Sequence, residues 1–172
     1  MVVFDASVLL FVLNENTPAS VPRAKERVEY LIDRLSAAGE RIIIPTPALS
    51  ECLVHAGPAG PDYLAVIGKN ACFRVASFDE RAAVEAAVRT YQARERGLRK
   101  GGNPESARGK IKFDRQIVAI AVVERATTVY SDDKDVIAYA REAGMEGYLL
   151  ADLPLPPDDP QSSLPLGPFG GA

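Results

Sequence analysis

Hydrophobic residues in this chain occur either in short strand-like runs or in longer stripes with helical spacing. The short runs predict strands, and they lie at 2–4, 42–44, 73–77, 128–131 and 148–150. Between them, hydrophobic residues recur every three or four positions, most clearly at Val28, Leu31, Ile32 and Leu35. Because parallel strands are joined by helical crossovers, the alternation predicts an α/β fold. We expect a three-layer α/β/α sandwich with a mainly parallel central sheet.

Start and stop signals place the expected helices more closely. A helix is expected to begin at Ser7, another to end at Gly39, and a third to begin at Thr46 and Pro47. Further helices are expected at 63–69, from a capping box at Ser77 and Glu80 to about Arg96, from Asp114 onward, and at 133–143. The helix before Arg96 carries an apolar stripe of Val84, Ala87, Val88 and Tyr91. Residues 97–112, rich in glycine and basic residues, are expected to form a loop.

Composition fits one globular domain. The chain has 172 residues, of which 47% are hydrophobic, and this is enough for a single core. We expect the domain to span residues 1–152, with the proline- and glycine-rich residues 153–172 as a C-terminal tail. The two cysteines and one histidine provide neither a disulfide framework nor a zinc site, which favours the reducing cytoplasm. No apolar stretch reaches the roughly 18 residues of a membrane span, so no membrane contact is expected.

Four acidic residues occupy similar places near the ends of predicted elements. Asp5 and Asp133 each follow a strand, while Glu51 and Asp114 lie near the beginning of helical patterns. In an open parallel sheet, ligands bind at the carboxyl ends of the strands, so the four side chains are expected to meet there. Grouped carboxylates repel one another, and a hard divalent cation such as Mg²⁺ or Mn²⁺ removes that cost. Two such ions, about 3.5 to 4 Å apart, can hydrolyse a phosphodiester.

Simpler explanations exist for each acid taken alone. Asp5, Asp114 and Asp133 can stabilise helix N-termini, and Glu51 can be a solvated surface charge. His55 is more typical of a packing or surface residue than of a catalytic one, and Cys52 is typical of a small buried hydrophobe. Cys72 is interpreted like Cys52. The aromatic residues Tyr63, Phe73 and Tyr91 can stack on bases, but at these spacings they are more typical of core residues.

A basic segment stands out in an acidic protein. The net charge is −3, so the surface as a whole does not attract a polyanion, and any nucleic-acid contact must come from a local patch. The expected phosphate-binding residues are Arg99, Lys100, Arg108, Lys110, Lys112 and Arg115. Because the segment leads into the helix that carries Asp114, it can bring RNA phosphates to the acids through charge contacts. The alternative is a solvated loop without a ligand.

Four short motifs resemble one family in their order and spacing. They are Phe4-Asp5-Ala6-Ser7, Ala48-Leu49-Ser50-Glu51, Phe113-Asp114-Arg115-Gln116-Ile117, and Ser131-Asp132-Asp133-Lys134-Asp135. Together they resemble the PIN domain, and within it the VapC-type toxins of prokaryotic toxin–antitoxin pairs. The resemblance covers about residues 1 to 150. The chain departs from a compact toxin in the segment 97–112 and in its proline-rich tail, which leaves the toxin role open.

The resemblance implies a Mg²⁺- or Mn²⁺-dependent endoribonuclease with a PIN-like fold. It gives the acidic roles to Asp5, Glu51, Asp114 and Asp133, and an additional metal-binding role to Asp135. Ser7 and Ser131 match its small hydroxyl positions beside the metal, and the register among Asp132, Asp133 and Asp135 stays open. The implied partners are an RNA substrate, a small antitoxin protein and a second copy of the chain in a homodimer. The apolar N-terminal helices can form that dimer interface, or they can belong to an ordinary core.

Two other functions compete with the nuclease. A phosphatase with an aspartyl nucleophile also places an Asp after its first strand, but it requires a second acid two residues later, where this chain has Ser7. A PIN-like scaffold that binds RNA or protein without cutting is the second alternative. The presence of all four acids argues against the scaffold, because a protein that does not cut has no need to retain them.

Overall fold

The predicted strands form one parallel sheet. The computed structural model describes residues 1–19, 21–95 and 106–157, with side-chain placement omitted for 106–111. The strands are β1 (Val2–Phe4), β2 (Ile42–Pro45), β3 (Phe73–Ala76), β4 (Thr128–Tyr130) and β5 (Glu146–Tyr148). They pair in the order β3-β2-β1-β4-β5, and every pairing is parallel. The α/β prediction is therefore confirmed, and β1, which carries Asp5 at its end, lies at the centre of the sheet.

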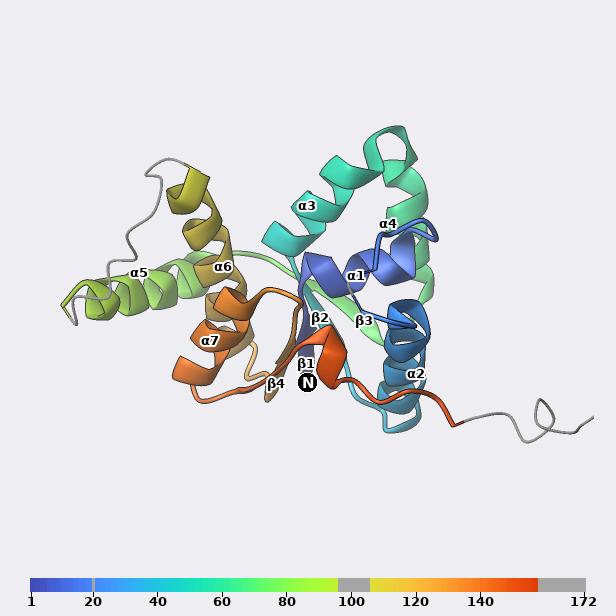
Figure 1. The fold of residues 1–172 in the computed structure, drawn as a ribbon. Coiled ribbons are helices and arrows are strands. Elements are labelled where there is room, and N and C mark those ends of the chain that lie inside the picture. Colours follow the sequence, from blue (N-terminus) through green and yellow to red (C-terminus); the bar gives the residue numbers. More distant parts are fainter. Residues whose placement is uncertain (20, 96–105, 158–172) are drawn as a thin grey trace, which may run out of the picture.

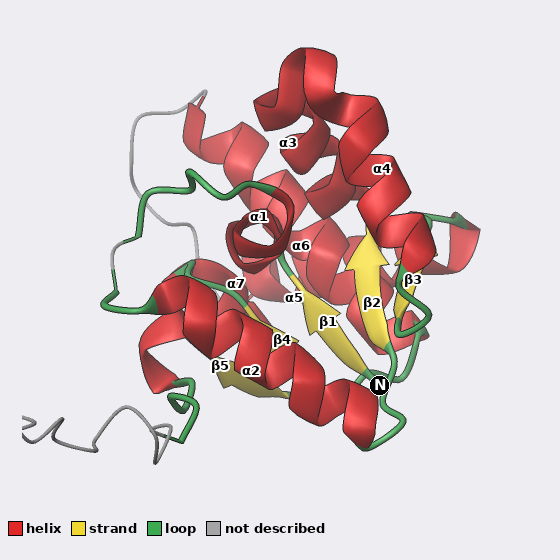
Figure 2. Cartoon of the chain, turned by 90° about the vertical axis from the view of Figure 1, so that its right-hand side faces the viewer, coloured by secondary structure: helices red, strands yellow, loops and turns green. Residues whose placement is uncertain are grey.

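Helices cover both faces of this sheet (Figures 1 and 2). They are α1 (Ala6–Leu13), α2 (Ala24–Ala37), α3 (Thr46–Ala56), α4 (Gly60–Lys69), α5 (Glu80–Glu95), α6 (Ser106–Val123) and α7 (Lys134–Glu142), with short 3₁₀ turns at Gly57–Ala59 and Leu150–Asp152. Successive strand residues point to opposite faces. Val3 packs with α3, α4, α6 and α7 in one core, and its neighbours Val2 and Phe4 pack with α2 in the other. Helix α1 contributes to both cores, which fixes the chain just after Asp5.

Two predicted helix features are wrong in detail. The helix expected from Asp114 begins at Ser106, so it covers part of the expected loop. Gly109 suggested a loop, but one glycine costs a helix only about 1 kcal/mol, which favourable neighbours can outweigh. Helix α5 is capped by Asp79, whose Oδ1 accepts from the Ala82 amide at 3.0 Å, and Ser77 is not its cap. The remainder of the expected loop, residues 97–105, lies outside the described residues.

The apolar stripe of α5 is also not a core stripe. Val84, Val88 and Tyr91 are 60%, 47% and 65% exposed, so the interpretation of Tyr91 as a core residue is wrong. Helix α5 instead packs against α6, and Ala82 is its buried residue among those described. Periodicity identifies an apolar face, but it does not tell whether another element covers that face.

The last strand and the tail differ slightly from expectation. The strand expected at 148–150 runs from Glu146 to Tyr148, because it pairs with β4, and Leu150 packs into the core after the strand has ended. Leu153, the first residue of the expected tail, is also buried in that core, and its carbonyl oxygen accepts from Arg27. The expected tail beyond residue 157 lies outside the described residues. Within the described ranges, the helices are all too short or too polar to span a bilayer.

Candidate active site

Asp5 lies at the carboxyl end of the central strand with its side chain buried. The β1–β4 ladder continues into this residue, because the Asp5 amide donates to the Tyr130 carbonyl at 3.0 Å. Asp5 precedes α1, and its backbone carbonyl accepts from the helix, but its side chain makes no capping hydrogen bond. Helix capping therefore does not explain this carboxylate, which is only 6% exposed.

Two serines hold the Asp5 carboxylate. Ser131 Oγ donates to Asp5 Oδ2 at 2.6 Å, and Ser7 Oγ donates to the same oxygen at 3.1 Å. Each hydroxyl also accepts a backbone amide from the turn after β4: Ser131 accepts from Asp133 at 3.0 Å, and Ser7 accepts from Asp132 at 2.9 Å. Ser131 is fully buried. The two hydroxyls thus join the ends of β1 and β4 and orient the carboxylate between them.

Asp133 has a dual environment. It is the N-cap of α7, where its Oδ1 accepts from the Asp135 amide at 2.8 Å, so the capping interpretation holds for this residue. Its charge also makes a small contribution to the raised pKa of Asp5, so the two carboxylates lie close enough to interact. Asp132, Asp133 and Asp135 are all partly buried. Among these three, the coupling to Asp5 favours Asp133 as the acid that shares its site.

Asp114 and Glu51 come from the helices next to this pair. Asp114 is 6% exposed on α6, which packs against α3 and β2. Glu51 lies exposed in the second turn of α3. The next residue, Cys52, is buried and has its pKa raised to about 12, first by burial and then by the charges of Asp5 and Glu51. Both carboxylates therefore act on the same buried thiol.

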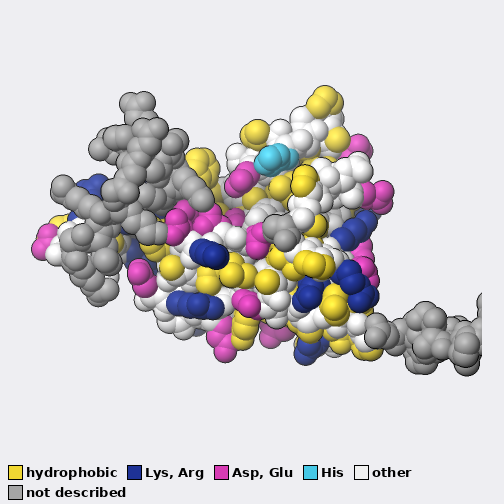
Figure 3. Space-filling model, in the orientation of Figure 1, with side chains coloured by type: hydrophobic (Ala, Val, Ile, Leu, Met, Phe, Trp, Pro, Cys, Tyr) yellow, Lys and Arg dark blue, Asp and Glu magenta, His cyan; other side chains and the backbone are white. Residues whose placement is uncertain are grey.

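Acidic side chains gather on one part of the molecular surface. Figure 3 shows Asp and Glu side chains gathered between α3 and the pair α6 and α7. Burial raises the pKa of Asp5, and the charge of Asp133 adds to this effect, whereas hydrogen bonds from Ser131, the Ala6 amide and Ser7 lower it. The ionised form of Asp5 is therefore costly in this environment, and a nearby positive charge would stabilise it.

The donor set fits a hard divalent cation in its chemistry. All the candidate ligands are carboxylate oxygens, which Mg²⁺ and Mn²⁺ prefer. Within the described ranges, no three acidic, histidine or cysteine side chains are grouped closely enough to hold an ion. Mg²⁺ usually retains several waters and binds through one or two carboxylates, so the coupled pair Asp5 and Asp133 meets its minimum need. Asp114 and Glu51 are the flanking acids that can complete a larger set.

The predicted phosphate-binding residues are only partly described. Arg99 and Lys100, together with the side chains of Arg108 and Lys110, lie outside the described residues. Lys112 is exposed on α6. Arg115 is partly buried, and its guanidinium carbon lies 5.6 Å from the centroid of the Tyr139 ring. His55 is exposed at the end of α3, which agrees with a surface residue.

Sequence reasoning missed the residues that surround Arg115. Arg89 on α5 and Tyr139 on α7 line a pocket with it. Tyr139 follows Asp135 by four positions, so the two share one face of the helix, and this spacing was the available signal. For Arg89 there was no such signal, because only the packing of α5 on α6 brings it near.

Comparisons with known proteins identify the fold. No family model and no curated protein matches this sequence. A structure of VapBC2 from Rickettsia felis, bound to a DNA fragment from its promoter, matches with a TM-score of 0.59 at 13% identity, over 87% of this chain and 98% of the matched chain. DNA-bound VapBC from Salmonella typhimurium matches at 0.57 and 18% identity, over 87% and 97%. Mycobacterium tuberculosis VapC20, a toxin that cleaves the sarcin–ricin loop, matches at 0.53 and 15% identity, over 80% and 94%. The chain thus has the PIN-like fold of the VapC toxins, as its motifs indicated.

Proposed function

We propose that this chain, which has the fold of the VapC toxins, is a divalent-metal-dependent endoribonuclease. The observation that carries the proposal is the buried Asp5 carboxylate, held by Ser7 and Ser131 and coupled to Asp133 at the end of the central strand. A buried carboxylate beside a second acid is unfavourable in isolation, so its presence at a ligand-binding edge of the sheet is a sign of function. Stability alone offers no reason for this arrangement.

Each residue of the site has a distinct part in the proposed reaction. Asp5, Asp133 and Asp114 would hold Mg²⁺ or Mn²⁺, with Asp135 as an additional acid. When bound, the cation supplies a water of lowered pKa and neutralises charge on the phosphodiester. Ser131 and Ser7 keep the Asp5 carboxylate fixed, so little reorganisation is needed when the substrate arrives. Glu51, which is exposed on α3, can accept a proton or orient the attacking water.

The substrate and partners are proposed from the neighbours. VapC20 is described as cleaving the sarcin–ricin loop, which supports RNA as the substrate. Several other neighbours were solved as VapBC complexes, which supports a small antitoxin partner and the toxin role of a type II pair. We extend the proposal to a homodimer, which the sequence resemblance implies. Lys112 and Arg115, on the helix that carries Asp114, are placed to contact RNA phosphates.

Cleavage of a mixed pool of structured and unstructured RNA tests the proposal. The purified wild type is compared with Asp114→Asn in Mg²⁺, Mn²⁺ or EDTA, and with Asp33→Asn, an exposed aspartate on α2, as the matched control. Since even outer-shell substitutions at metal sites cost about 10- to 100-fold, Asp114→Asn should lower cleavage by at least about 100-fold. The control should cut like the wild type.

Two results would count against the nuclease. Cleavage that persists in EDTA would refute the dependence on a divalent metal. A folded wild type that neither cuts RNA nor binds metal would exclude the enzyme and favour the scaffold that binds RNA or protein without cutting it.

A further inference from the structure

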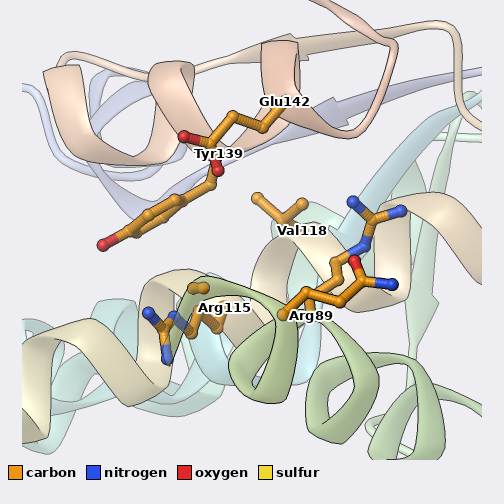
Figure 4. Close-up of a pocket in the computed structure, with 7 residues that line it drawn as sticks. Arg89, Arg115, Val118, Tyr139 and Glu142 are labelled. Atoms are coloured by element: carbon orange, nitrogen blue, oxygen red, sulfur yellow. The ribbon is translucent and has the colours of Figure 1, made fainter. Parts of the chain in front are cut away.

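A pocket opens between the helices α5, α6 and α7 (Figure 4). Its volume is about 80 Å³, and its lining residues are Arg89, Gln92, Ala93, Arg115, Val118, Tyr139 and Glu142. In Figure 4, Tyr139 and Glu142 extend from α7 on the side of the pocket opposite Arg89 and Arg115. A cavity needs a volume of only about 10–15 Å³ to hold one water molecule, so this pocket has room for a group the size of a phosphate.

The pocket and the acidic site share two helices, α6 and α7. Arg115 directly follows Asp114 on α6, and Tyr139 lies one helical turn after Asp135 on α7. Glu142 extends the same face of α7 by nearly another turn. A strand whose phosphate lies at the acids can therefore follow α6 and α7 to this pocket.

The lining combines three kinds of recognition that a nucleotide requires. Arg115 offers a planar guanidinium to a phosphate, and its packing over the Tyr139 ring at 5.6 Å creates a stacked pair. Nucleobases stack on both aromatic rings and guanidinium planes, so a base can extend this stack. Gln92 and Glu142 supply hydrogen-bonding groups for a base edge.

Arg89 contributes a weaker charge than Arg115. Its Nε donates to Glu85 Oε1 at 2.6 Å, so part of its charge is compensated on its own helix. Together with Glu142, this leaves the pocket close to neutral, which does not suit an isolated anion such as inorganic phosphate. A nucleotide, with one negative charge and a large polar base, fits this lining better.

We propose that this pocket binds a nucleotide of single-stranded RNA that flanks the scissile phosphate. The inference rests on the proposed function for its substrate, but it concerns a separate binding step. A protein partner that inserts an acidic side chain is the competing occupant, and the experiment separates the two.

Binding is measured by fluorescence anisotropy, using a short fluorescein-labelled single-stranded RNA of mixed sequence in EDTA, where cleavage does not interfere. The variants are Arg115→Gln, Tyr139→Leu and Tyr139→Phe. The control is Arg41→Gln, an exposed arginine just before β2, at the opposite end of the strands from the acids. From the measured strength of base–aromatic stacking, Tyr139→Leu should bind roughly tenfold more weakly. Tyr139→Phe should stay within about twofold of the wild type, because it keeps the ring.

The salt dependence gives a readout that a merely structural role would not change. Arg115→Gln should reduce the slope of log K against log salt by about 0.7, the value for one lost phosphate contact on a single strand. Arg41→Gln should leave the slope unchanged. Since Tyr139 also packs against the core, melting curves are used to identify any loss of fold in Tyr139→Leu. If that variant does not fold, the affinity and salt dependence of Arg115→Gln test the pocket.

The outcomes separate this inference from the nuclease proposal. If the wild type binds RNA through these residues but does not cut it when metal is present, the nucleotide pocket is supported and the nuclease proposal is refuted. If the wild type does not bind the RNA, or if Arg115→Gln and both Tyr139 variants bind with the affinity and salt slope of the wild type, the nucleotide pocket is refuted. The second result would leave the acidic partner side chain as the occupant.

Discussion

Replacing Ser131 with alanine tests how the acidic site is held together. The Ser131 hydroxyl is buried, donates to Asp5 Oδ2 at 2.6 Å and accepts from the Asp133 amide at 3.0 Å. Ser131→Ala therefore removes a charge-assisted hydrogen bond and leaves a partly buried amide without its acceptor. A hydrogen bond to a charged group contributes about 1.5–3 kcal/mol, and an unsatisfied amide costs about 1 kcal/mol or more. We expect a loss of about 3 kcal/mol in the free energy of unfolding, or roughly 6–12 °C in Tm for a chain of this size.

The loss should depend on pH in a defined direction. Burial raises the pKa of Asp5 above its ordinary value of 3.8, so the folded state gains stability from the protonated acid. This contribution is complete below pH 3.8 and is lost as the pH rises through the folded pKa. The Ser131 hydrogen bond opposes that shift, so Ser131→Ala raises the pKa of Asp5 further. The cost of the substitution should therefore be larger at pH 7 than near pH 4.

Urea unfolding at several pH values, without added metal, measures this effect. Ser50→Ala, at an exposed position on α3, serves as the control and should change stability by no more than about 0.5 kcal/mol. A Ser131→Ala variant as stable as the wild type, or one whose cost grows toward acid pH, would refute the reasoning.

Three further predictions concern other parts of the molecule. Mn²⁺ at about 100 times its Kd should stabilise the wild type by about 2.7 kcal/mol, or roughly 5–10 °C in Tm. The variant Asp5→Asn, which removes a buried charge, should show no such shift. An equal shift in both proteins would contradict the role of Asp5. Gly147→Ala should lower the free energy of unfolding, measured in urea, by about 1–3 kcal/mol, since the added Cβ would lie 2.8 Å from Ile137 Cγ2. Gly68→Ala, in open space on α4, should instead stabilise the protein by up to about 1 kcal/mol. A Gly147→Ala variant as stable as the wild type would show that β5 can move. Cys52 is buried and its pKa is raised to about 12, so iodoacetamide at pH 8 should leave it unmodified while the protein is folded. Mass spectrometry after digestion measures the labelling. Rapid labelling would mean that the core around α3 opens.

Much of the fold was predictable because its strands carry strong local signals. Ile42–Ile44 is a continuous β-branched run, as expected of a strand covered on both faces, and all three residues are fully buried. Strand β5 was displaced by two residues in the prediction, since Glu146 and Tyr148 are exposed at the sheet edge and give no buried run. The placement of β4 beside β1 depends on contacts across the whole chain, and no local pattern encodes it.

The candidate site was predictable in part for the same reason. Asp5 and Asp133 were identified because each follows a strand, and the sheet rule then brings the strand ends together. The hydrogen bond from Ser131 to Asp5 depends on the exact neighbour relation of β1 and β4, which only the structure reveals. Arg89 illustrates the limit, because on its own amphipathic helix it looks like any surface arginine.

The central claim is that acids from separate elements form one divalent-metal site, and an anomalous diffraction map of crystals grown with Mn²⁺ tests it most directly. The account predicts a Mn²⁺ peak within ligand distance, about 2.0–2.6 Å, of the carboxylate oxygens of Asp5 and at least one of Asp114 and Asp133. A peak elsewhere on the protein, or no peak at a Mn²⁺ concentration that supports RNA cleavage in solution, would contradict it.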